Sequence, residues 1–88
     1  MKLKYNFVVN EVAGETVAVS VGNDAGSFNG YIKLNKTGAF IFNELKKETT
    51  RDEIVAKMKK EYPDANEQDI IESVDDLLEK LSKAELLI

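Results

Sequence analysis

The chain has 88 residues with a formal net charge of −4, and 43% of its residues are hydrophobic. A chain of this length predicts a single domain, and its apolar share provides one small core and argues against disorder. The absence of cysteine excludes disulfides and thiolate metal sites, and the absence of histidine removes the commonest general base and transition-metal ligand.

Alternating apolar residues predict two strands near the start of the chain. Residues 5–12 form the first, and residues 15–21 form the second, in which valines alternate with small or polar residues. Between them, Ala13 and Gly14 favour a turn, although this pair is not among the strongest two-residue turn signals. We therefore expect a hairpin.

The sharpest change of pattern lies near the middle of the sequence. Alternation over residues 28–34 predicts a third strand, and the pattern breaks at Asn35. Asn is a preferred N-cap, and the apolar residues after it recur at helical spacing, so we expect a helix over about residues 35–47. Gly38 lies inside this helix, where it costs roughly 1 kcal/mol relative to Ala. It indicates either simple tolerance or the close approach of another backbone.

Two further helices are expected to follow. The first begins at Thr50, where residues 50–53 fit the capping-box pattern, and it ends before Pro63. The second runs from about residue 66 to residue 84, and its apolar residues cover a wider arc than a minimal core-facing stripe. Residues 86–88 form an apolar tail that we expect to pack back on the core.

Three short strands followed by three helices predict an α+β fold, a single domain over residues 1–88 with a small three-stranded antiparallel sheet. The second and third helices resemble a helix-turn-helix, so the whole is similar to a winged helix. No apolar run approaches the roughly 20 residues of a membrane helix, and no apolar signal segment follows the N-terminus. We therefore expect a cytoplasmic protein with no membrane partner.

The distribution of charge bears on the class of partner. Residues 65–88 carry two lysines and seven acidic residues, whereas residues 35–64 carry seven basic and six acidic residues. The second helix of a helix-turn-helix enters the DNA groove, and DNA affinity rests largely on cation contacts with phosphate. The acidic last helix therefore argues against nucleic acid as a partner, and a winged-helix DNA-binding transcriptional regulator is the alternative interpretation.

No poised catalytic group is evident in the sequence. Asp69, Glu72 and Asp76 share one face of the last helix, but a solvated polar face explains them. We therefore expect a protein that is not an enzyme and that has no catalytic residues, no metal and no cofactor. A sheet in so small a domain has an open edge, which favours peptide binding by strand addition.

The run Leu34-Asn35-Lys36-Thr37-Gly38-Ala39-Phe40-Ile41-Phe42, preceded by a short strand, resembles the LN-x-TGAFIW signature of the PqqD family. Phe42 stands where that family often has Trp. The resemblance implies a winged-helix-like recognition element that binds the leader of a ribosomally made precursor peptide as an extra strand. Such elements present the peptide to a modifying enzyme, often a radical S-adenosylmethionine protein.

Carried over by position, the resemblance implies a binding groove between the third strand and the third helix. The acidic third helix adds the hypothesis that the bound leader has a basic residue near Asp75 or Asp76. Without the resemblance, Ile71 and Leu78 would be interpreted as ordinary core residues. The implied peptide-binding residues are Gly30, Tyr31, Ile32 and Lys33 on the strand and Ile71, Val74, Asp75 and Leu78 on the helix.

These observations together predict a non-catalytic peptide chaperone that recruits a precursor peptide to a separate modifying enzyme. The pathway would be the synthesis of pyrroloquinoline quinone or of another modified peptide. A domain that docks a folded protein is a third interpretation. Because an open strand edge can also pair two copies, we expect a monomer or a weak homodimer.

Overall fold

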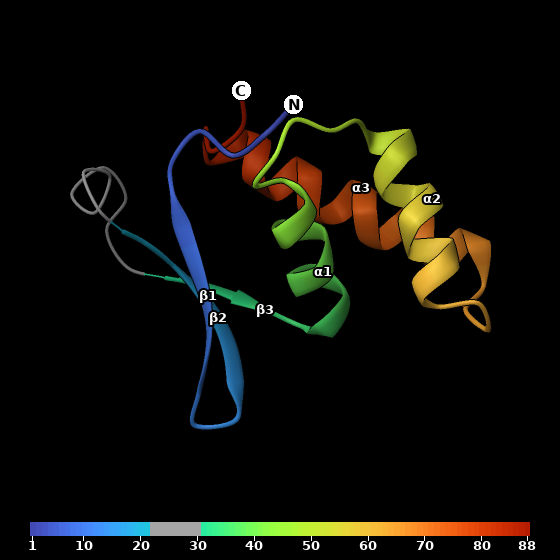
Figure 1. Cartoon of the computed structure of the whole chain (residues 1–88), viewed down its shortest axis with the longest axis horizontal. Helices are drawn as coiled ribbons and strands as arrows, with labels where there is room; N and C mark the ends of the chain where they lie inside the picture. Colours follow the sequence, from blue (N-terminus) through green and yellow to red (C-terminus); the bar gives the residue numbers. More distant parts are fainter. Residues whose placement is uncertain (22–30) are drawn as a thin grey trace.

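The computed structural model describes residues 1–21 and 31–88. Within these residues the strands form one antiparallel sheet in the order β1-β2-β3, and the helices gather on one side of it (Figure 1). The prediction of an α+β fold, with strands followed by helices, is confirmed. The elements are β1 (Phe7–Val12), β2 (Glu15–Ser20), β3 (Ile32–Leu34), α1 (Lys36–Glu44), α2 (Arg51–Glu61) and α3 (Glu67–Lys83).

The β1–β2 connection is a two-residue turn formed by Ala13 and Gly14 and closed by the Val12–Glu15 pair. Both turn residues have positive φ, 52° for Ala13 and 82° for Gly14. This conformation is typical of the primed turns, whose twist matches that of a hairpin. The predicted hairpin is confirmed, and Ala13 adopts a backbone conformation that Gly or Asn would adopt more easily.

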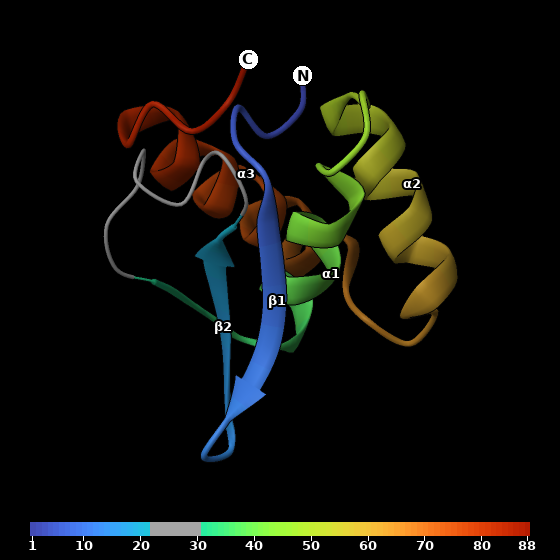
Figure 2. The same ribbon diagram turned by 60° about the vertical axis from the view of Figure 1, so that its left-hand side comes forward.

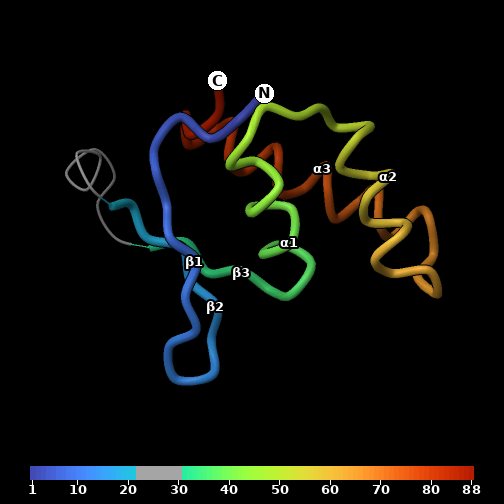
Figure 3. Tube along the Cα trace, in the orientation of Figure 1, coloured from blue at the N-terminus to red at the C-terminus, as the bar shows by residue number. Residues whose placement is uncertain are grey.

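The predicted start of each helix is confirmed, because each start is encoded by a capping side chain. Thr50 accepts a hydrogen bond from the N–H of Glu53 at 3.2 Å, and Asn66 accepts one from the N–H of Gln68 at 2.8 Å. Asn35 caps α1, which follows β3 almost without a loop (Figure 3). In the described parts of the chain, no helix has both the length and the apolar character that crossing a membrane requires.

Three predicted boundaries differ from the structure by two residues or more, and one of them is the start of the first strand, predicted at residue 5 and found at Phe7. The helix expected to reach residue 47 ends at Glu44, because the carbonyl of Leu45 accepts a hydrogen bond from the N–H of Leu3 at 2.8 Å. This contact with the N-terminal segment takes the place of a further helical turn. The third strand was predicted over residues 28–34, of which residues 28–30 lie outside the described residues, and β3 itself begins at Ile32.

The core lies between the inner face of the sheet and the helices. Phe7 of β1 meets Phe42 of α1 edge to face, with ring centroids 5.2 Å apart and ring planes at 83°. Ala18 of β2 is fully buried in the same cluster, whereas the neighbouring Val17 and Val19 line a shallow pocket on the outer face of the sheet. The sheet therefore turns Phe7 and Ala18 toward the core and Val19 toward the outer face.

The two ends of the chain lie side by side, above the helices in Figures 1 and 2. Leu3 and Leu87 form an isolated antiparallel bridge, and the N–H groups of Lys2 and Ile88 each donate to the other residue's carbonyl, at 2.8 and 2.9 Å. Leu86 is 2% exposed and Ile88 is 61% exposed. The apolar tail therefore packs on the core through Leu86, as expected, while Ile88 faces solvent.

Candidate functional site

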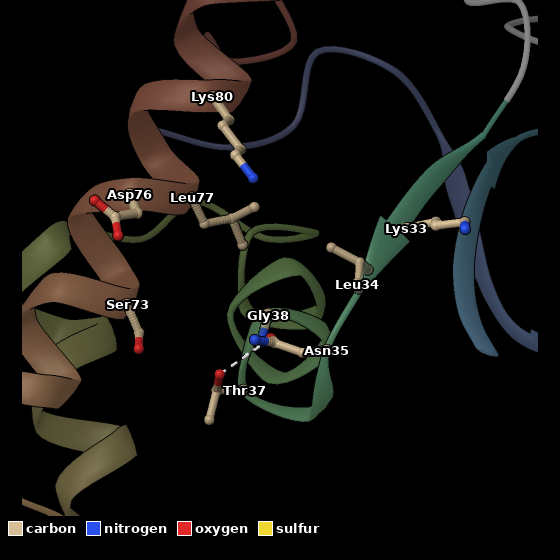
Figure 4. A pocket seen from close by; sticks show the side chains of 9 residues that line it. All are labelled: Lys33, Leu34, Asn35, Thr37, Gly38, Ser73, Asp76, Leu77 and Lys80. Atoms are coloured by element: carbon tan, nitrogen blue, oxygen red, sulfur yellow. Dashed lines mark hydrogen bonds between the residues drawn. The ribbon is translucent and has the colours of Figure 1, made fainter. Parts of the chain in front are cut away.

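A groove of about 280 Å³ separates β3 from α3 (Figure 4). The start of α1 forms its floor, so α3 meets there two elements, β3 and α1, that follow one another directly in the sequence. One wall is the last part of β3, and the other is one side of α3. The residues that line the groove are Lys33, Leu34, Asn35, Thr37, Gly38, Ser73, Asp76, Leu77 and Lys80.

The strand that borders the groove is an edge strand. On one side β3 pairs with β2, where Ala18 lies opposite Ile32 and Thr16 lies opposite Leu34. In residues 1–21 and 31–88, no strand pairs with the other edge of β3, and this edge faces the groove (Figure 4). Main-chain groups on such an edge are available to an added strand. An extended peptide in the groove would therefore lie beside them.

The floor of the groove is shaped by the N-cap of α1. The Oδ1 atom of Asn35 accepts from the N–H of Gly38 at 2.7 Å and from the hydroxyl of Thr37 at 3.1 Å. A Cβ on Gly38 would lie 2.9 Å from the same Oδ1 atom and 3.6 Å from the Leu34 side chain. The close approach at Gly38 is thus made by a capping side chain and not by another backbone, which was one of the two interpretations of this glycine.

This contact makes the effect of Gly38→Ala depend on residue 35. In the wild type the added methyl group displaces the capping oxygen, and losing an N-cap costs about 1 kcal/mol. We expect Gly38→Ala to lower the free energy of unfolding by about 0.5–1 kcal/mol, since the steric contact and the lost cap outweigh the better helix propensity of Ala. In an Asn35→Ala background the same change should stabilise by about 0.5–1 kcal/mol. Urea denaturation of the four proteins measures both values, and equal effects in the two backgrounds would contradict the proposed contact.

The described strand residues of the predicted site lie on the two faces of the sheet. Ile32 is half-buried and packs against the core. Lys33 and Tyr31 face the opposite side, where Lys33 pairs with Glu15 at 3.4 Å and Tyr31 is 57% exposed. Gly30, which was also predicted, lies outside the described residues. Of the predicted strand residues that the structure describes, only Lys33 lines the groove, and the role of these residues in binding stays a prediction.

The predicted residues of α3 lie away from this groove. Val74 is fully buried in the core. Asp75 accepts from Arg51 of α2, from Nε at 2.6 Å and from Nη2 at 3.0 Å. At 100° per residue, Ile71 and Leu78 belong to the same margin of the helix as Asp75. None of these four residues lines the groove, and their role in binding stays a prediction.

The opposite margin of α3 faces β3, and sequence reasoning missed it. Ser73, Leu77 and Lys80 lie on this margin and line the groove together with Asp76. On a helical wheel both margins of the apolar stripe look alike, because Leu77 borders one side as Leu78 borders the other. The pairing of Arg51 with Asp75 distinguishes the two margins, because it places α2 against the margin that carries Asp75 and Leu78.

The ion pair between Arg51 and Asp75 bears on which acidic residue of α3 could contact a ligand in the groove. The hydrogen bond from the Arg51 guanidinium holds the pKa of the Asp75 carboxyl below its usual value, and the same bond raises the pKa of Arg51. The charge of Asp75 is therefore engaged within the domain. Of the two residues that we hypothesised to meet a basic leader residue, only Asp76 lines the groove, and its carboxylate points away from β3 (Figure 4).

The fold and the groove define a small winged-helix-like domain with an open strand edge. The family model described as Coenzyme PQQ synthesis protein D (PqqD) matches residues 15–87, so the chain belongs to the PqqD family. The resemblance carried by residues 34–42 is thereby confirmed. No curated protein matches the chain.

A solved structure described as "TbiB1 in Complex with the TbiA(beta) Leader Peptide" is similar to this chain. Its TM-score is 0.70 at 24% sequence identity, and the match covers 99% of this chain and 94% of that chain. TbiB1 is thus a protein whose structure contains a bound leader peptide. For this chain, the likeness confirms the fold.

Proposed function

We propose that this domain binds the leader of a ribosomally made precursor peptide and presents it to a modifying enzyme. The observation that carries the proposal is the open edge of β3, which faces α3 across the groove. Membership of the PqqD family and the leader peptide in the TbiB1 structure support the same class of ligand.

In this proposal the leader adds to the sheet as a strand beside β3. Hydrogen bonds between the main chains supply affinity, and side chains supply specificity. Alternate residues of a strand point to opposite faces. Every second leader residue would therefore meet Leu34 and Leu77 in the groove, and the others would face the outer side of the sheet beside Tyr31.

The domain itself contributes recognition and no catalysis in this proposal. The sequence contains neither histidine nor cysteine, and the proposal assigns the chemistry to a partner, for which a radical S-adenosylmethionine enzyme is the first candidate. The synthesis of pyrroloquinoline quinone or of another modified peptide is the proposed setting. DNA binding gains no support, because the exposed side of α3 carries acidic residues such as Asp69, Glu72 and Glu79.

A nuclear magnetic resonance titration of ¹⁵N-labelled protein tests this function. The ligands are synthetic leader segments encoded by short reading frames beside its gene. We expect saturable shifts concentrated on residues 32–34 and on Ser73, Leu77 and Lys80, with the amides of α2 unchanged. A proline in the bound segment should weaken binding, because it removes a main-chain donor. Shifts confined to the outer face of the sheet would contradict strand addition beside α3.

A further inference from the structure

Lys80 places a positive charge inside the groove. Its side chain extends from α3 toward β3, and its Nζ atom lies in the gap above Leu77 (Figure 4). Among the described residues, no carboxylate lies within ion-pair distance of this ammonium group. Lys83, one turn away, pairs with Glu79 at 2.9 Å. Of these two lysines, therefore, only Lys83 forms an ion pair within the described residues.

Lys80 is an exposed residue, and its surroundings leave its charge as the main electrostatic feature at the groove. Leu34 and Leu77 provide an apolar surface beside it, and Figure 4 shows their side chains pointing toward each other. Lys33 on the strand wall is paired with Glu15, and the carboxylate of Asp76 points away from β3 in Figure 4. Low-dielectric walls strengthen the effect of a charge in a cleft on an incoming ligand.

We propose that the leader carries an Asp or Glu whose carboxylate pairs with Lys80, on the same face as an apolar residue that covers Leu34 and Leu77. This inference rests on the proposed function and specifies its ligand. A helix rises about 1.5 Å per residue, so Lys80 lies roughly 4.5 Å beyond Leu77 along the axis. Same-face residues of a strand are roughly 6.6 Å apart, and the lysine side chain spans the difference. The acidic residue therefore stands two positions from the apolar one.

The order of these two residues reports the direction of the added strand. β3 runs toward the start of α1, and α3 runs in roughly the opposite direction (Figures 1 and 4). A leader antiparallel to β3 passes Leu77 first and Lys80 second, so its acidic residue lies on the C-terminal side of the apolar one. A parallel leader has the reverse order. Antiparallel addition continues the arrangement of the existing sheet, and we expect this order.

Selection from a displayed library of random 12-residue peptides tests the inference without knowledge of the natural ligand. Three baits are compared: the wild type, Lys80→Glu, and Lys83→Glu as a matched control on the same helix. We expect wild-type binders to be enriched in an apolar residue followed two positions later by Asp or Glu. Lys80→Glu should select Lys or Arg at that second position, and Lys83→Glu should keep the wild-type preference.

Affinities of one enriched peptide complete the test. We expect Lys80→Glu to weaken its binding about tenfold, because a groove-side attraction becomes a repulsion, and a Lys in place of the peptide's acid should restore binding to that variant. Captured peptides that lack the acidic preference, or keep it with Lys80→Glu, overturn this inference and leave peptide binding intact. If no bait captures a peptide, both the proposed function and this inference fail.

Discussion

Leu77→Lys is expected to weaken leader binding about thirtyfold while the domain stays folded. Leu77 is half-buried, and its side chain points across the groove toward Leu34 (Figure 4). Burying a leucine side chain contributes about 1.5–3 kcal/mol, and about 1.4 kcal/mol corresponds to a tenfold change in affinity. Fluorescence anisotropy with a peptide selected against the wild type measures the change.

The comparison with Leu78→Lys separates the groove in the structure from the site predicted from the sequence. Both leucines are half-buried and pack against the core, but they lie on opposite margins of α3. We expect the two substitutions to cost similar stability in urea denaturation, with only Leu77→Lys weakening binding more than threefold. Ala56→Lys, on the exposed side of α2, controls for the added charge. A loss of binding confined to Leu78→Lys would show that the leader uses the other margin.

Apolar periodicity and capping residues predicted the helices and strands of this fold, because each of these features acts within a few residues along the chain. The side chains of Asn35, Thr50 and Asn66 each accept a backbone hydrogen bond at a helix start. The first two starts were predicted from these capping residues, and the third was predicted near residue 66. The end of α1 was not predicted, since it depends on a hydrogen bond from Leu3, which is far away in the sequence. The sequence marked Gly38 as a position of possible close contact, but that the contacting atom is Asn35 Oδ1 can be seen only in the folded N-cap.

In the candidate site, too, one part was predictable from neighbouring residues and another part depends on residues far apart in the sequence. Its strand wall is formed by β3, which the alternation of apolar and polar residues predicts as a strand. The position of β3 at an edge of the sheet follows from its place as the last of the strands. Its helix wall depends on which margin of a wide apolar stripe turns toward β3. That choice is made by the packing of α2, through Arg51 and Asp75, which are 24 residues apart. Helical periodicity alone does not show which of Leu77 and Leu78 faces β3, because both border the apolar stripe.

Phe42→Ala is expected to remove a large share of the stability of the domain. Phe42 is fully buried and meets Phe7 edge to face, so it joins α1 to the sheet. Truncating a buried phenylalanine costs about 3–5 kcal/mol. A chain of this length has a total stability of about 4–13 kcal/mol, at roughly 0.05–0.15 kcal/mol per residue. Urea denaturation followed by circular dichroism measures the loss, and the groove should be lost with the fold because its floor belongs to α1.

Phe40→Ala is the matched control, two residues earlier on the same helix. Phe40 is half-buried and meets Tyr62 at the end of α2, with ring centroids 6.0 Å apart. A partly exposed ring loses less transfer free energy and leaves a site that solvent can fill, so we expect a loss of about 1–2 kcal/mol. Similar losses for the two alanines would mean that the Phe7–Phe42 contact does not dominate the core. In that case the attachment of α1 to the sheet would rest mainly on the chain connection at Asn35 and on the burial of Leu34.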